Sequence, residues 1–280
     1  MLYADCFGAF TPLSTADKGY SIAVDTSGNS YNTGSFTGYM IMGHSIEIKA
    51  VGSIDAYIIK LDSFGVPVWA KSFGRSNNDV GYGIAVDTLG NSYTTGSFKD
   101  SMIVGNTTLT SAGQTDIFII KLDSFGTPIW AKNYGGISYD NGLDIAVDTL
   151  GNSYTTGNFA GTMTVGNITL TTAGANDMFI IKLDSFGVPL WAKRYGGPNG
   201  DAGTSIAVDA SGNSYSTGYF QGTMTVGSTN LTSVGGRDIF IIKLDSSGSP
   251  IWAVGYGSSI DDEGKGIQIG ALGSVYTCGY

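Results

Sequence analysis

The chain has 280 residues and a mass of 29.1 kDa, which is enough for one large or two ordinary domains with an apolar core and excludes a disulfide-stapled mini-protein. Charged residues make up 13% of the chain and 43 residues are glycine. An average soluble domain has about 25% charged residues and about 7% glycine, so this composition is typical of a turn-rich, all-β protein. The net charge of −9 comes without any basic run, which argues against a nucleic-acid partner.

No apolar run approaches the roughly 20 residues of a membrane-spanning helix, so no membrane span is predicted. The first ten residues contain Asp5 but no lysine or arginine. The start of the chain therefore lacks the basic head of a signal peptide, and these features leave the location of the protein open.

One motif recurs along the whole chain at a nearly constant period. The sequence I-A-V-D begins at Ile22, Ile84, Ile145 and Ile206, and a related I-Q-I-G begins at Ile267. Residues 84–144 and 145–205 are identical at 42 of 61 positions. Such self-similarity at a fixed period is the signature of a repeat architecture.

Each repeat contains four short β-like runs separated by turn residues. In chain order they are I-A-V-D (run a), S-Y-T-T-G-S-F at Ser92–Phe98 (run b), D-I-F-I-I-K-L-D at Asp116–Asp123 (run c) and the run that starts at Pro128 (run d). Run c is apolar on both faces, which indicates a sheet covered on both sides. Four-stranded meanders repeated at a constant period predict an all-β β-propeller.

The repeat sequence also resembles a known family. The stretch D-I-F-I-I-K-L-D-S-F-G-T-P-I-W-A-K-N-Y-G-G, followed by D-x-G-x-x-I-A-V-D-T-L-G-N-S-Y-T-T-G, resembles the bacterial SBBP β-propeller repeat, and its turns are similar to those of NHL and quinoprotein repeats. The resemblance implies that run a lines a central channel and that run d is the outer strand. It implies an extracellular or cell-surface location and no established activity.

The strand count favours five blades. Runs a and b occur five times, run c occurs four times, and run d occurs four times with a degraded fifth copy at Tyr3–Gly8. We predict a single domain over residues 1–280 whose closing blade takes strands from both termini and is three-stranded if no further run c exists. The alternative is that the chain is a piece of a larger ring. The predicted repeats are 22–83, 84–144, 145–205 and 206–266, with a closing blade from 1–21 and 267–280.

The two faces of the predicted propeller differ. The a–b and c–d turns are short and nearly the same in each repeat, whereas the b–c and d–a connections on the opposite face are longer and vary. Binding residues are usually carried on variable loops over a rigid scaffold, so a protein or glycan ligand is predicted on the variable-loop face.

One aspartate recurs five residues before each run a. Five carboxylates around a channel mouth could bind a polar ligand or a hard cation such as calcium; no other metal site and no cofactor is predicted. The alternative is that each aspartate caps its own turn. These residues are Asp17, Asp79, Asp140, Asp201 and Asp262.

The two cysteines, Cys6 and Cys278, fall in the same predicted closing blade. They could form a disulfide that closes the ring. The alternative is two free, buried thiols, because nothing in the sequence indicates an oxidising compartment.

Catalysis by a carboxylate pair needs one protonated and one charged acid in unlike environments, whereas corresponding positions here are nearly identical. The sequence therefore predicts a non-enzymatic scaffold for protein interaction or for surface or extracellular assembly. Near-identical weak sites could act together on a clustered ligand, which leaves a multivalent lectin-like glycan binder as the alternative. A glycoside hydrolase, which also occurs on five-bladed propellers, is the less favoured one.

Overall fold

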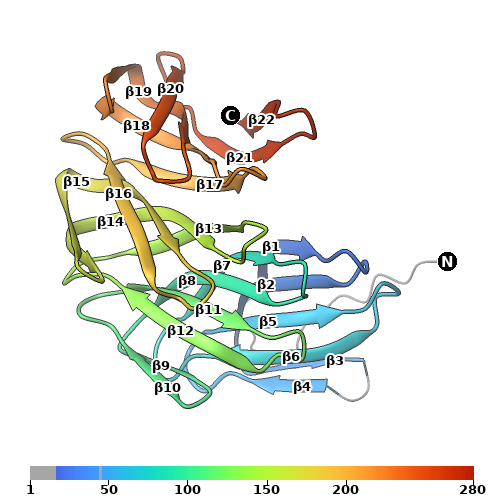
Figure 1. Ribbon diagram of the computed structural model, residues 1–280. Helices are drawn as coiled ribbons and strands as arrows, with labels where there is room; N and C mark the ends of the chain where they lie inside the picture. Colours follow the sequence, from blue (N-terminus) through green and yellow to red (C-terminus); the bar gives the residue numbers. More distant parts are fainter. Residues whose placement is uncertain (1–16, 44–45) are drawn as a thin grey trace.

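Four antiparallel sheets of four strands and a last sheet of two strands follow one another along the chain, and two further two-stranded sheets are hairpins inserted between strands of the first two (Figure 1). This architecture comes from a computed structural model, which describes residues 17–43 and 46–280. The prediction of an all-β fold built from four-stranded antiparallel meanders is confirmed by the first four sheets.

The first two sheets each pair four strands in chain order. The first consists of β1 (Lys18–Val24), β2 (Ser30–Phe36), β5 (Asp55–Leu61) and β6 (Pro67–Phe73). The second consists of β7 (Val80–Val86), β8 (Ser92–Phe98), β11 (Asp116–Leu122) and β12 (Pro128–Tyr134).

The remaining sheets repeat this order. The third consists of β13 (Asn141–Val147), β14 (Ser153–Val165), β15 (Ile168–Leu183) and β16 (Pro189–Tyr195). The fourth consists of β17 (Ala202–Val208), β18 (Ser214–Val226), β19 (Thr229–Leu244) and β20 (Pro250–Tyr256). The two-stranded sheet consists of β21 (Gly264–Ile269) and β22 (Val275–Gly279).

The segment between runs b and c is a β-hairpin and not a loop connection. It forms β3 (Tyr39–Met42) with β4 (Ile46–Lys49), and β9 (Ser101–Val104) with β10 (Thr107–Thr110). In the third and fourth sheets it continues the long strands β14–β15 and β18–β19. Alternate side chains are buried, as in β9, where Met102 and Val104 pack into the core. This period-2 apolar pattern is what holds the hairpin on the sheet.

Turn chemistry ends the strands where the sequence predicts. After β7, the Oδ1 atom of Asp87 accepts hydrogen bonds from the amides of Leu89 and Asn91 at 3.0 and 2.9 Å. Gly90 in the same turn has a φ of 77°, a conformation that favours glycine. The same arrangement recurs in the other a–b turns that begin with aspartate.

The first strand of every sheet lines one central cavity of about 590 Å³, as the family resemblance implies for run a. These strands are β1, β7, β13, β17 and β21. The apolar side chains between neighbouring sheets form the cores, and Ile84, Ile145 and Ile206 are each 3–4% exposed there.

Polar contacts between neighbouring sheets follow one scheme. In the second sheet, the Tyr93 hydroxyl donates to the carbonyl of Gly151, and Lys121 Nζ and Trp130 Nε1 both donate to the carbonyl of Ser185, at 3.1, 3.2 and 3.1 Å. Both acceptors lie in turns of the third sheet. We call the tyrosine, lysine and tryptophan of one sheet its interblade clamp. The equivalent clamps of the first and third sheets make the same bonds to the sheets that follow them.

The described residues form four complete four-stranded sheets and, after them, a two-stranded sheet. The sheet β21–β22 contains one copy each of runs a and b. The degraded run d at Tyr3–Gly8 lies outside the described residues. The closed five-bladed ring and the three-stranded closing blade therefore stay predictions.

The clamp predicts different effects for the same substitution in two sheets. Tyr154 Oη lies 3.0 Å from Gly212 O of the next sheet, while Tyr215 Oη is bonded only to Asp209 of its own sheet. We expect Tyr154→Phe to lower the free energy of unfolding by about 1 kcal/mol more than Tyr215→Phe, because it also removes a buried intersheet bond. Denaturant unfolding of both variants measures this, and equal losses would contradict it.

Candidate functional site

The five aspartates predicted to ring the channel mouth lie before the first strands, and three of them are fully buried. Asp140 accepts hydrogen bonds from the amides of Gly136 at 2.7 Å and Ala160 at 3.0 Å. Asp79 and Asp201 accept from the equivalent amides of their own repeats. Each of these carboxylates thereby ties its d–a connection to the end of a neighbouring strand.

The other two members of this set are less buried. The Oδ1 atom of Asp17 accepts from the amide of Thr37 at 3.2 Å. The Oδ2 atom of Asp262 accepts from the amide and hydroxyl of Ser258 at 2.7 and 2.9 Å. These contacts match turn capping, the alternative that the sequence left open. Ligand or calcium binding by the five aspartates stays a prediction.

The sequence analysis missed a second buried carboxylate beside the first. It is the aspartate that opens run c, and it is 0–2% exposed in all four complete sheets. A Cβ atom on Gly74 would lie 2.6 Å from both Asp55 Oδ1 and Asp79 Oδ2, so the two carboxyl groups of the first sheet converge over this glycine. The available signal was the aspartate at the start of every run c: Asp55, Asp116, Asp177 and Asp238.

Burial governs the titration of these carboxyl pairs. Burial, with a smaller contribution from the partner carboxylate, raises the pKa of Asp79 to about 7 and the pKa values of Asp140 and Asp201 to about 6. The Oδ1 atoms of Asp116 and Asp177 have no hydrogen-bond partner among the described atoms. Such a pair keeps a proton near neutral pH more readily than two charges.

Metal-binding groups are few in the part of the chain that the structure describes. There, no group of three or more histidine, cysteine, aspartate or glutamate side chains is placed to hold a metal ion.

Asp144 is the one carboxylate among the residues that line the central cavity. Its Oδ2 atom accepts from the Ser205 hydroxyl at 2.8 Å and from the amide of Ile206 at 2.9 Å. Burial raises its pKa to about 6. Because these bonds join β13 to β17, Asp144 serves the contact between two sheets.

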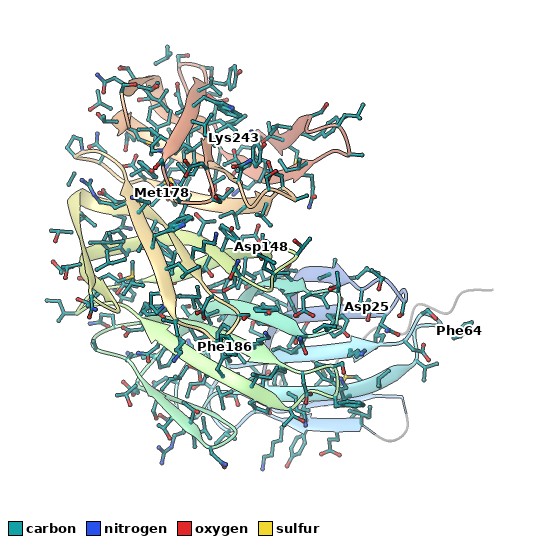
Figure 2. The ribbon with its side chains drawn as sticks, viewed as in Figure 1. Asp25, Phe64, Asp148, Met178, Phe186 and Lys243 are labelled. Carbon is teal, nitrogen blue, oxygen red and sulfur yellow. The ribbon has the colours of Figure 1, made fainter. Side chains whose placement is uncertain are left out.

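Apolar side chains project from the tips of the short turns on the face opposite the variable loops. Phe64 is 91% exposed and leaves the β5–β6 turn into solvent (Figure 2). Equivalent residues in the other turns are 78–96% exposed. We call this set the apolar turn tips: Phe64, Leu89, Phe125, Leu150, Phe186 and Leu272.

The turns do not require these apolar side chains. The amide of Phe64 donates to Asp62 at 2.9 Å, and the amide of Ser247 makes the same bond to Asp245 at 2.9 Å in the fourth sheet. Serine also occupies the tip at positions 27 and 211. The sequence analysis placed binding on the other face and missed this set, although the variation between phenylalanine and serine at one turn position was visible in the repeats.

The face that carries the apolar turn tips is rich in aspartate. Each a–b or c–d turn of the four complete sheets begins with an aspartate, and the clamp residues Lys60, Lys121 and Lys182 are 6–8% exposed. A hydrogen bond from Ser247 holds the pKa of Asp245 below its usual value. The turn aspartates are Asp25, Asp62, Asp87, Asp123, Asp148, Asp184, Asp209 and Asp245.

Small hollows lie between neighbouring turns on this face. One of about 210 Å³ is lined by Lys60, Leu89 and Ser124 among others. Another of about 310 Å³ is lined by Leu150, Lys182 and Ser246 among others. An apolar tip therefore stands beside a polar hollow at both places.

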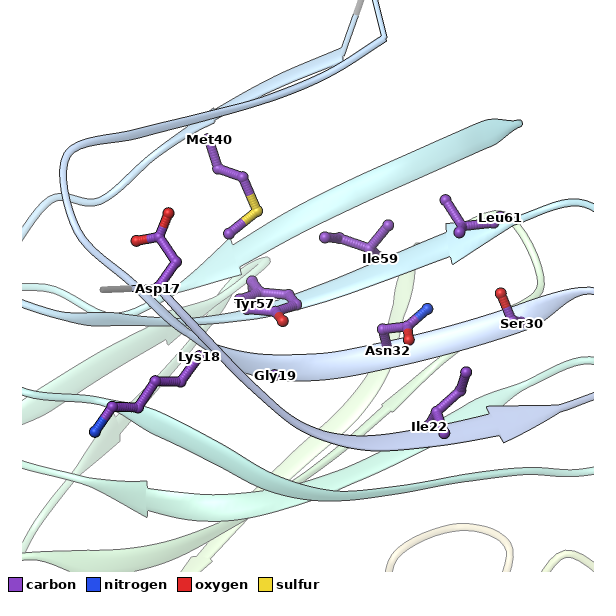
Figure 3. Close-up of a pocket in the computed structure, with 10 residues that line it drawn as sticks. All are labelled: Asp17, Lys18, Gly19, Ile22, Ser30, Asn32, Met40, Tyr57, Ile59 and Leu61. Atoms are coloured by element: carbon purple, nitrogen blue, oxygen red, sulfur yellow. The ribbon is translucent and has the colours of Figure 1, made fainter. Parts of the chain in front are cut away.

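A different cavity, of about 370 Å³, opens on the first sheet (Figure 3). It is lined in part by Ile22, Met40 and Ile59. Ile22 is 63% exposed, whereas its counterpart Ile84 is 4% exposed because the first sheet packs on it. This cavity therefore lies on the side of the first sheet that corresponds to the covered side of the second.

Comparison with known families identifies the repeat. Residues 68–97 and 190–219 match the SBBP beta-propeller repeat. These two segments are SBBP repeats. The predicted resemblance is confirmed, and it supports a β-propeller architecture for the four-stranded sheets.

Two curated relatives match part of the chain. An uncharacterized WD repeat-containing protein of Acanthamoeba polyphaga mimivirus is 30% identical over 173 residues, which cover 50% of this chain and 12% of that protein. The regulatory protein FlaEY of Caulobacter vibrioides is 26% identical over 168 residues, which cover 57% of this chain and 18% of that protein. The matched segments span less than a fifth of either curated relative.

Two solved structures align with most of the chain at low similarity. A protein of unknown function from Bacteroides caccae aligns over 89% of this chain and 86% of its own, with 9% identity and a TM-score of 0.39. Chaetomium thermophilum Sqt1, solved with the N-terminus of a ribosomal protein, aligns over 94% and 82%, with 10% identity and a TM-score of 0.36.

Within residues 17–43 and 46–280, no helix is long and apolar enough to cross a membrane.

The two cysteines are only partly covered by the structure. Cys278 is free and exposed on β22, so the interpretation of it as a buried thiol is wrong. Cys6 lies outside the described residues, and a disulfide between Cys6 and Cys278 stays a prediction.

The raised pKa values of Asp79, Asp140, Asp144 and Asp201 predict a pH dependence of stability. Their carboxyl groups hold protons up to about pH 6–7 in the folded protein, but only up to about pH 4 in the unfolded chain. The folded state binds more protons between these values, so the free energy of unfolding falls as the pH rises from about 4 to 7. We expect a higher Tm at pH 5 than at pH 8; a flat or rising profile would contradict this.

Turn capping predicts unequal effects of two amide substitutions. Asp201 is fully buried and bonds the amides of Gly197 and Gln221, whereas Asp262 is half-buried and bonds only Ser258. An asparagine offers one acceptor oxygen, so Asp201→Asn leaves a buried amide unpaired and costs about 1–3 kcal/mol. We expect Asp262→Asn to cost less. Thermal unfolding of both variants measures the difference, and an unchanged Tm for Asp201→Asn would contradict the capping role.

Proposed function

We propose that this protein is a non-enzymatic propeller-repeat scaffold whose apolar turn tips bind a cationic, apolar segment of a partner protein. The observation that carries the proposal is the exposure of Phe64, Phe125 and Phe186, at 79–91%, in turns whose hydrogen bond to aspartate also forms when serine occupies the tip. Apolar surface that the fold does not use, surrounded by polar residues, marks an interaction site.

Charge defines the partner further. Eight turn aspartates surround the tips, and the clamp lysines are buried. Lys71 and Lys132, which are less buried, lie beside the turns of Phe125 and Phe186 but are fewer than the aspartates. A segment rich in lysine or arginine complements this field and associates faster because of it. Several tips on one rigid face also allow a partner with repeated apolar residues to bind at many points, which strengthens binding.

The variable-loop face is the other place proposed for a ligand, on the strength of its sequence diversity. We favour the turn face because three carboxylates of the loop-face set already accept two backbone amides each. These are Asp79, Asp140 and Asp201.

The five-bladed ring is part of the proposal. It is supported by the five first strands around one cavity and by the constant period of the repeat. An extracellular or cell-surface assembly role is supported only by the family resemblance.

Selection from a displayed peptide library tests the proposed site. The wild-type chain serves as bait, and the triple variant Phe64→Ser, Phe125→Ser, Phe186→Ser removes peptides that bind elsewhere. We expect the enriched peptides to combine basic with aromatic or aliphatic residues and to lose at least about 10-fold in affinity for the triple variant, as expected for removal of aromatic anchors. The triple variant should keep the wild-type Tm, because Ser247 shows that the turn accepts serine.

Two outcomes would reject the site. One is a peptide set that binds the triple variant as tightly as the wild type, and the other is the absence of any basic, apolar enrichment. A glycan array run in parallel, with and without calcium, tests the lectin alternative. A reproducible glycan signal that survives in the triple variant would move the proposed function to the variable-loop face.

A further inference from the structure

Two asparagine–glycine dipeptides occur in the chain, Asn141–Gly142 and Asn199–Gly200. An asparagine followed by glycine is chemically labile, because glycine has no Cβ atom to keep its amide nitrogen away from the preceding side chain. Asparagine is one of the thermolabile residues of proteins. The structure places the two dipeptides in opposite environments, so the fold decides which of them can react.

Asn199–Gly200 lies in the d–a connection between β16 and β17 (Figure 1). Asn199 is exposed, and its Nδ2 atom makes a long hydrogen bond to the carbonyl of Gln221, at 3.4 Å. The amide of Gly200 has no hydrogen-bond acceptor within residues 17–43 and 46–280. A Cβ atom on Gly200 would meet no atom of a non-adjacent residue within 4 Å. The peptide unit between the two residues therefore has room to rotate.

Asn141–Gly142 is held in strand β13. In the pairing with β14, Asn141 lies opposite Asn158 and Gly142 lies opposite Gly157. Gly142 is buried, and a Cβ atom there would lie 2.2 Å from Thr95 Oγ1. A reaction between Asn141 and the next amide therefore requires the strand to open first.

We propose that Asn199 is a site of spontaneous deamidation in the folded protein, which adds a negative charge to the variable-loop face between the third and fourth sheets. The amide nitrogen of Gly200 bonds to Cγ of Asn199 and loses its proton, and the side-chain nitrogen takes up a proton and leaves as ammonia. Water then opens the resulting five-membered imide at either carbonyl, which leaves aspartate or isoaspartate at position 199. The sum of the two steps is the hydrolysis of one amide. This inference does not depend on the proposed function of the turn tips.

The product changes how position 199 contacts the fourth sheet. Asn199 Nδ2 donates to the carbonyl of Gln221, whereas a carboxylate has no hydrogen to donate to that oxygen. A Cβ atom on Gly222 would lie 2.8 Å from Asn199 Nδ2, so this side chain lies against the chain at Gly222. Position 199 is also two residues before Asp201, which accepts from the amides of Gly197 and Gln221. Deamidation therefore loosens the contact between this d–a connection and β18, and it does so irreversibly.

Ageing of the full chain tests the proposal. The protein is incubated at neutral pH, and peptide mass spectrometry follows the conversion at positions 199 and 141. We expect Asn199 to convert at least about 10-fold faster than Asn141 in the folded protein, because β13 must open locally before Asn141 can react. In urea that unfolds the chain, the two rates should agree within about 3-fold, since both asparagines precede glycine.

Two variants and a matched control assign the charge change to this dipeptide. Gly200→Ala should convert at least about 10-fold more slowly, because the added Cβ atom hinders the approach of the amide nitrogen. It should keep the wild-type Tm, since the position has free space and no left-handed φ. Asn199→Gln should not convert over the same period, because its longer side chain would have to close a larger ring. The control, Asn141→Gln, removes the other dipeptide and should acquire the acidic form as fast as the wild type.

Isoelectric focusing measures the acidic form, and Asn199→Asp marks its position. The proposal is wrong if Asn199 stays unconverted in the aged wild type, if Asn141 converts as fast as Asn199 in the folded protein, or if Gly200→Ala ages as fast as the wild type. Thermal unfolding of each sample before ageing shows that the compared proteins are folded.

Discussion

The hydrogen bonds between neighbouring sheets are the contact on which the rest of this molecule depends. A meander buried on both faces has no solvent-exposed face. Every sheet therefore needs a neighbour that supplies both apolar surface and hydrogen-bond acceptors for its polar groups. The clamp does this with few atoms: a buried lysine and a tryptophan share one turn carbonyl, as Lys121 and Trp130 share that of Ser185. The turn that carries this carbonyl and the clamp residues that bond it must therefore both be present in each repeat. This requirement explains why the short turns vary so little between repeats while the opposite connections are free to differ.

The need for contacts between sheets also divides the residues of each face into those that the fold uses and those that are free to bind a ligand. At the loop ends, the buried aspartates are used by backbone amides and by a second carboxyl group, as at Asp55 and Asp79. At the turn ends, the first aspartate and the glycine are needed but the tip side chain is not. An exposed phenylalanine at a tip that accepts serine, as Phe64 against Ser247, is therefore surface that the fold does not use and where we propose binding. Binding sites on this scaffold are better sought at positions where the repeats carry different residue types than at positions where every repeat needs the same one.

A repeat fold also allows equivalent residues to be compared within one chain. Each contact between sheets occurs several times, so a side chain without the usual contact is recognised by comparison with its equivalents. Lys243 and Trp252 at one end and Ile22 at the other are the same residues that are satisfied or covered elsewhere. The contacts and exposure of these side chains depend on which sheet carries them and not on residue type, as expected for architectures in which each unit contacts only its neighbours.

The sequence by itself determined the strand order, most strand limits and the repeat. Run b at Ser92–Phe98 and run d from Pro128 need only local turn chemistry and apolar patterning to be recognised, and both are strands in the structure. Only the tertiary structure decided which polar residues make hydrogen bonds that hold the fold together. Whether Asp140 faces a ligand or amides depends on Gly136, which is local in sequence, and on Ala160, which only the folded sheet brings to it. The carboxyl pair over Gly74 and the exposure of Phe64 likewise depend on the folded structure. The burial of a side chain and the hydrogen-bond partners around it are set by how the sheets pack together. A sequence pattern alone therefore does not predict them.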